Sequence, residues 1–145
     1  MRYSELIQLF FERSNALQWY WTLYVVVVGG LLAFSSLRVR QDAITGTLVT
    51  VLFVLFAYKN LGAIHDTTVQ RLATLQAIHE YPTSGRQDAL NTRRDNEFLE
   101  PTLVAPAYEG VRNFHIASDA LTIAAIWAME LRRVRAKRNA IPAPE

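Results

Sequence analysis

Hydrophobic residues along this chain gather into three long runs that polar segments separate. The first run, residues 17–37, is 21 residues long and carries no charged side chain. The second is uncharged from Ala43 to Tyr58 and continues to Ile64, because the long side chain of Lys59 can extend its amine to the membrane surface. The third covers residues 107–131. A helix rises about 1.5 Å per residue, so each run can cross a hydrocarbon core of about 30 Å. The pattern predicts an all-α integral membrane protein with three transmembrane helices.

The remaining segments complete a single membrane domain over residues 1–145. Residues 1–16 alternate apolar and polar positions like an amphipathic helix, which lies at the membrane surface or extends the first span into water. The second helix meets no proline before Pro82, so we expect it to project beyond the membrane to about residue 81. An apolar stripe along this projection predicts a packing partner: Leu61, Ile64, Val69, Leu72, Leu75 and Ile78. Residues 82–106 form a polar loop with a short helix over residues 84–99, and residues 132–145 form a basic tail.

Basic and aromatic residues indicate how the spans are oriented. Aromatic residues gather at the start of the first span, where such rings favour the headgroup level: Trp19, Tyr20, Trp21 and Tyr24. The hinge between the first two spans and the tail after the third hold seven basic residues that suit topology signals or anionic lipid headgroups: Arg38, Arg40, Arg132, Arg133, Arg135, Lys137 and Arg138. Segment 65–111 holds four arginines against seven acids. The positive-inside rule places the hinge and C-terminus in the cytoplasm and the N-terminus outside, with a bacterial inner or plasma membrane as the expected location.

Two stripes of small residues predict close helix packing. The first span carries Gly29, Gly30 and Ala33, and the third carries Ala120, Ala124 and Ala128. Small side chains let two backbones approach closely inside a membrane.

The third span also carries ionisable residues, which are costly in a bilayer and therefore usually paired or functional. At helical spacing His115, Asp119, Thr122 and Glu130 share one face, which we expect to point inward. The second and third spans are antiparallel, so Lys59 and Asp119 come within reach of an ion pair. We assign an intramembrane polar cluster to Lys59, His65, Asp66, His115, Asp119 and Thr122. The cluster serves either this structural pairing or an ion path. Glu130 is explained by local pairing with Arg132 and Arg133.

Other chemistries find less support in the residues. His65 and His115 could together ligate haem or a metal, but no ligand motif accompanies them, and we expect no cofactor. The chain lacks cysteine, a nucleophile elbow and a phosphate-binding loop, so we expect no enzyme. The basic tail lacks the aromatic residues of a nucleic-acid reader.

We therefore expect a non-enzymatic small multi-pass protein that acts through helix association, as an accessory or assembly subunit of a larger membrane complex. Its partners would be the bilayer and a membrane protein, or further copies of itself. Two alternatives stay open. One is a homo-oligomeric channel lined by the third helix, with Ile126 as an apolar gate. The other is a haem- or metal-binding redox subunit.

Overall fold

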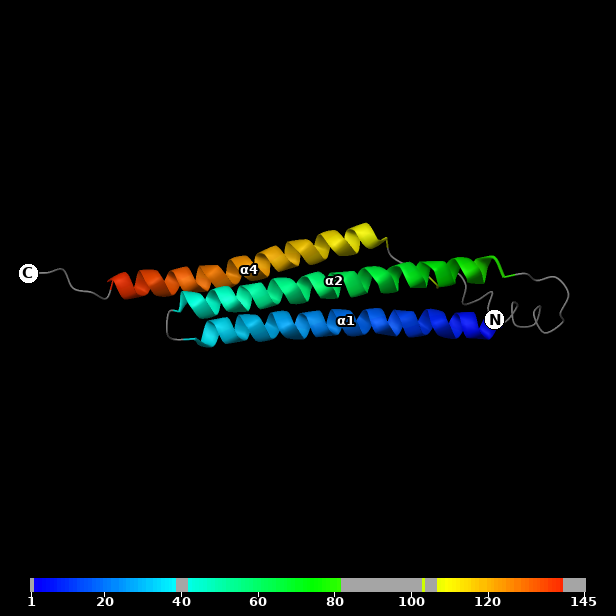
Figure 1. Cartoon of the computed structure of the whole chain (residues 1–145), viewed down its shortest axis with the longest axis horizontal. Helices are drawn as coiled ribbons and strands as arrows, with labels where there is room; N and C mark the ends of the chain where they lie inside the picture. The colour runs from blue at the N-terminus through cyan, green and yellow to red at the C-terminus, as the bar shows by residue number, and fades with distance from the viewer. Residues whose placement is uncertain (1, 39–41, 82–102, 104–106, 140–145) are drawn as a thin grey trace, which may run out of the picture. The chain divides into compact units, whose positions relative to one another are not determined.

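The computed structural model of the chain describes residues 2–38, 42–81, 103 and 107–139. These residues form three helices: α1 (Tyr3–Leu37), α2 (Ala43–His79) and α4 (Tyr108–Asn139) (Figure 1). Each is long and apolar enough to cross a membrane. The predicted all-α, three-span fold is confirmed. The predicted short helix at 84–99, Arg40 and the end of the tail lie outside the described residues.

The structure shows how the first and second helices continue beyond their apolar runs. Residues 3–16 and the first span form one uninterrupted helix, so the amphipathic segment is an extension of the span and makes no turn onto a surface. The absence of glycine and proline before Gly29 explains this continuity, because no residue there breaks the helix. As predicted, α2 continues past its apolar run, and it ends at His79.

The chain divides into two compact units, and all three helices contribute to both. Unit 1 contains Met1–Trp21 and Gly62–Val111, and unit 2 contains Thr22–Leu61 and Arg112–Glu145. The divisions fall near the ends of the predicted spans. Unit 2 therefore holds most of the uncharged residues, and unit 1 holds most of the segments expected outside the hydrocarbon core.

Unit 1 has a small apolar core between the start of α1 and the end of α2. Its buried members are Tyr3, Leu6, Phe10, Ile78 and Leu103. The rings of Tyr3 and Tyr81 meet edge to face at 5.4 Å, and the Arg71 guanidinium lies 4.7 Å from the centre of the Phe10 ring. The N-terminal extension of α1 is thus the packing partner that the stripe on the projecting part of α2 predicted.

The stripe itself is only partly as predicted. Ile64 and Ile78 are buried, whereas Val69 and Leu72 are 49% and 42% exposed. Most buried positions of α2 follow one another at steps of three, four or seven, which is the spacing of helices packed side by side along a shared seam. They are Phe53, Ala57, Asn60, Ile64, Thr67, Thr74 and Ile78, and Thr68 is buried beside this series. This spacing buries Thr67 and Thr74 and leaves the nearby Val69 and Leu72 exposed.

In unit 2 several polar residues face inward, and many large apolar residues lie on the outside. Three helix segments lie side by side there, with consecutive segments running in opposite directions (Figure 1). On α4 the buried residues are His115, Thr122, Ile126 and Glu130. Residues such as Val26, Leu52 and Leu121 are more than half exposed. This arrangement suits a lipid surround, because apolar side chains cost nothing there and polar ones need partners inside.

Candidate functional site

The most connected buried polar group in unit 2 is His115. Its side chain is completely buried, and its ring lies 4.2 Å from the ring of Tyr24 on α1. His115 Nδ1 lies 2.9 Å from Asp119 Oδ2, one turn later on α4. The other ring nitrogen, Nε2, lies 3.3 Å from Nδ2 of Asn60 on α2. The hydroxyl of Tyr24 donates to Asp119 Oδ1 at 2.8 Å. We call these four residues, Tyr24, Asn60, His115 and Asp119, the histidine clasp.

The geometry of the clasp determines where the hydrogen of the imidazole lies. An amide nitrogen can only donate, so His115 Nε2 accepts the bond from Asn60. Nδ1 then carries the hydrogen and donates it to Asp119. The carboxylate of Asp119 accepts a second bond from Tyr24. Every helix of unit 2 contributes at least one residue, so the clasp joins all three segments.

Buried hydroxyls in the same unit find partners within their own helices. The Thr122 hydroxyl donates to the carbonyl oxygen of Ser118 at 2.8 Å, and that of Thr50 donates to Gly46 at 2.8 Å. Such bonds satisfy the hydroxyl without linking one helix to another. The clasp and a second network, in contrast, link one helix to another.

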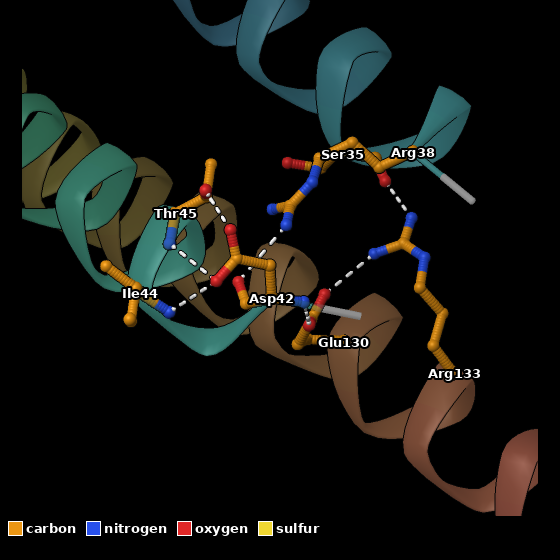
Figure 2. A network of polar contacts seen from close by, with 7 residues as sticks. All are labelled: Ser35, Arg38, Asp42, Ile44, Thr45, Glu130 and Arg133. Carbon is orange, nitrogen blue, oxygen red and sulfur yellow. Dashed lines mark hydrogen bonds and ion pairs between the residues drawn. The ribbon is translucent and has the colours of Figure 1, made fainter. Parts of the chain in front are cut away.

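The second network surrounds Glu130 and links the end of α1 and the residue before α2 to α4 (Figure 2). Glu130 Oε1 accepts the backbone N–H of Asp42 at 2.9 Å, and Oε2 accepts from Arg133 Nη1 at 2.9 Å. The same guanidinium donates to the carbonyl oxygen of Ser35. Arg38 donates to the carbonyl oxygen of Asp42 at 3.1 Å. The predicted pairing of Glu130 with Arg133 is present, and Glu130 also serves a more distant backbone group that the sequence did not suggest.

Asp42 caps the first turn of α2. Its carboxylate accepts the backbone N–H groups of Ile44 and Thr45 at 3.0 and 3.3 Å and also accepts the Thr45 hydroxyl. The Thr45 hydroxyl, followed by the N–H groups, holds the pKa of Asp42 below its ordinary value of 3.8. This is the usual role of an aspartate before a helix, because the first N–H groups of a helix have no partner within it.

The two networks lie at opposite ends of an apolar layer. Asn60 meets His115 and Asp42 meets Glu130, so the stretches of α2 and α4 between these contacts face each other. Phe53 and Ile126 lie within those stretches and are 2% and 4% exposed. The clasp and the Glu130 network are therefore separate sites, and the Thr50 and Thr122 hydroxyls that lie between them along α2 and α4 bond within their own helices.

The structure brings together some members of the predicted polar cluster and leaves others apart. His115, Asp119 and Thr122 lie on the inner face of α4 as expected. Lys59 is exposed. Its predicted ion pair with Asp119 is not among the ion pairs of the described residues, and Asp119 binds His115 and Tyr24 in its place. The reason is helical register: Asn60 occupies the inner seam of α2, and the neighbouring Lys59 consequently faces outward.

His65 and Asp66 belong to unit 1, apart from the clasp. His65 Nδ1 lies 3.1 Å from Asp66 Oδ1, and both side chains are largely exposed. The His65 ring also meets the ring of Tyr108 at 4.7 Å. Among the residues that the structure describes, histidine, aspartate and glutamate form no group of three suited to a metal ion.

The small-residue stripes lie on the outside of unit 2. Gly29, Gly30 and Ala33 are exposed on α1, and Ala120, Ala124 and Ala128 are exposed on α4. A Cβ atom added to Gly29 or Gly30 would meet nothing within 4 Å. The stripes therefore do not mediate packing within the described part of the chain.

Most of the predicted basic residues that the structure describes are at the surface. Arg132, Arg135, Lys137 and Arg138 are exposed on the last turns of α4, whereas Arg38 and Arg133 are half-buried in the Glu130 network. Arg38 and Arg133, which the sequence suggests as topology signals, thus also link the ends of the helices.

Sequence reasoning missed two members of the clasp. Tyr24 was expected with the aromatic residues at the headgroup level, but it is 2% exposed and points inward, whereas Trp19 is 73% exposed. Asn60 was passed over because it is uncharged. Its position three residues after the buried Ala57 and four before Ile64 could have identified it, since that spacing marks the inner seam.

The chain was compared with models of protein families, with curated proteins and with solved structures, and none of them gives a significant match. The function must therefore be argued from the arrangement of the residues.

Proposed function

We propose that this small three-span membrane protein acts through helix association, as an accessory or assembly subunit of a larger membrane complex. The observation that carries the proposal is the outward position of both small-residue stripes. Glycine and alanine let a second helix come close, and inside a bilayer close packing is a main source of helix–helix affinity. Here these positions are open for a partner.

The interior of unit 2 supports the same proposal. The buried imidazole, carboxylates and amide of the clasp and of the Glu130 network bond with groups of the same chain. These bonds explain how ionisable residues are tolerated at this depth, with no need for a substrate. The inward-facing polar residues of unit 2 thus stabilise the fold, and its outward-facing surface is available to bind a partner.

The geometry gives less support to a pore between copies of the chain. His115, Thr122 and Ile126 would line such a pore, but they are buried within a single chain. A central path between copies would have to be lined by outward-facing residues, and on α4 these are small or apolar, such as Ala120, Leu121 and Ala124.

The test is the native mass of the protein, extracted gently from its own membrane. We expect a heteromeric mass well above the 16.5 kDa of one chain. A mass of 16.5 kDa with lipid alone would contradict the proposal. A whole multiple of 16.5 kDa would show that the chain associates with further copies of itself and not with a different partner.

Variants then locate the surface. Gly30→Leu and Ala124→Leu should release the partner, because leucine side chains would separate the two backbones. The chain itself has room for a side chain at Gly30, and leucine favours a helix more than glycine does. Val51→Phe is the matched control, because it enlarges an exposed side chain of α2 away from both stripes. Equal partner loss in all three variants would show that the stripes are not the interface.

A further inference from the structure

A groove opens beside the Glu130 network, where the end of α1 meets the last turns of α4. Its volume is about 410 Å³, and its lining residues are Ser36, Met129, Arg132, Arg133 and Ala136. All five belong to unit 2. The groove lies where the apolar runs of α1 and α4 end, since Leu37 and Leu131 are the last residues before the basic positions.

The two arginines of the groove have different tasks. Arg133 is held by Glu130 and by the carbonyl oxygen of Ser35, so its position is fixed and its charge is balanced (Figure 2). Arg132 is exposed and takes part in none of the ion pairs found among the described residues. A guanidinium whose charge is unbalanced is thus available at the edge of a pre-formed groove.

The surroundings determine which ligand suits this guanidinium. The last turns of α4 also carry Arg135, Lys137 and Arg138, which attract anions. Met129 lines the groove, and Leu37 and Leu131 are 80% and 55% exposed near it, so an acyl chain would find apolar contacts there. An anionic group attached to a hydrocarbon chain, at the level of the lipid headgroups, satisfies both requirements.

We propose that the groove is a specific binding site for an anionic phospholipid, with Arg132 donating to the headgroup phosphate and the acyl chain lying along Met129. Arg133 forms the fixed wall of the site. The Ser36 hydroxyl already donates to the Ala33 carbonyl oxygen at 2.9 Å, so recognition of the phosphate depends on Arg132. A guanidinium fits this task because its planar fork can donate two parallel bonds to one phosphate. The site is distinct from the outer stripes and independent of the association proposed above.

The experiment is a titration of the full-length protein in detergent with phosphatidylglycerol, followed by native mass spectrometry, with phosphatidylcholine, whose zwitterionic headgroup has no net charge, as the comparison lipid. The wild type should retain one phosphatidylglycerol more tightly than further molecules. Arg132→Gln should weaken that first binding about tenfold, as for the loss of one charge-assisted hydrogen bond. Arg138→Gln removes the same charge about 9 Å further along α4 and should change the affinity less than about twofold.

A second pair of variants leaves every charge in place. Ala136→Trp fills the groove and should abolish the tightly held lipid, whereas Val134→Trp adds the same ring at a position that does not line the groove. Circular dichroism checks that all variants remain helical. Equal losses in Arg132→Gln and Arg138→Gln would overturn the proposal in favour of a diffuse attraction by the whole tail. Equal retention by Ala136→Trp and the wild type would also overturn it. Displacement of the lipid by millimolar inorganic phosphate would show that the site binds a free anion and is not specific for a lipid.

Discussion

Asn60 and His115 lie 55 residues apart in the chain, and their side chains meet inside unit 2 with 3.3 Å between Nδ2 and Nε2. This contact places Asn60 on the face of α2 that packs against α4. It also assigns the hydrogen of the imidazole to Nδ1, which in turn binds the carboxylate of Asp119. A neutral amide therefore controls the chemical form of a buried histidine.

Removing this amide should destabilise the protein. In Asn60→Leu, His115 Nε2 would lose its donor while remaining buried, and such an unsatisfied group costs about 1–3 kcal/mol. The unfolding free energy can be measured by titration with a denaturing detergent in mixed micelles. Tyr58→Leu on the exposed side of the same helix is the control and should change the free energy by less than about 0.5 kcal/mol. Equal effects of the two substitutions would show that Asn60 does not support the histidine.

The imidazole of His115 should be the neutral Nδ1–H form. Nitrogen-15 NMR of histidine-labelled protein distinguishes this form from the commoner Nε2–H form by the chemical shifts of the two ring nitrogens. His79 is exposed at the end of α2 and serves as an internal reference for a histidine in contact with solvent. A neutral Nε2–H signal for His115 would mean that the Asn60 amide presents its oxygen to the ring instead of its nitrogen.

Asp119 should be energetically coupled to Tyr24 and not to Lys59. The hydroxyl of Tyr24 donates to Asp119, so a double-mutant cycle of Tyr24→Phe and Asp119→Leu should give a coupling of about 0.5–2 kcal/mol. The cycle of Lys59→Met and Asp119→Leu should give a value near zero, because Lys59 is exposed and outside the clasp. Both couplings come from unfolding free energies measured in the same micelles. A larger coupling energy for Lys59 with Asp119 than for Tyr24 with Asp119 would support the ion pair that the sequence suggested.

The cap of α2 should weaken at low pH. The pKa of Asp42 is lowered in the folded protein, so its ionised form contributes stability above its ordinary value of 3.8. That contribution is lost as the pH falls below 3.8 and through the lower folded-state pKa. Thermal unfolding in detergent between pH 2 and 6 should show this loss in the wild type. Asp42→Asn caps a helix without titrating, so it should lack this component of the pH dependence. An unchanged profile in Asp42→Asn would assign the acid sensitivity to another group.

The sequence by itself determined the three helices that can cross a membrane and the inward face of α4. A long uncharged run that enters a bilayer forms a helix, because a helix lets each backbone N–H and C=O group bond within the same segment where no water is present. Helical spacing alone placed His115, Thr122 and Glu130 on one face, and all three are buried. Run length and helical spacing are properties of one segment, so they can be read directly from the sequence.

Only the tertiary structure decided which side chains meet. The partners of Asp119 and His115 on the other helices are Tyr24 and Asn60, two residues that carry no charge to mark them in the sequence. Charge suggested Lys59, but the register of α2 turns Lys59 outward and Asn60 inward. The same register buries Thr67 and Thr74 and exposes Val69 and Leu72. A rotation of α2 by a single residue, about 100°, would exchange Lys59 and Asn60, and only the packing of all three helices fixes that rotation.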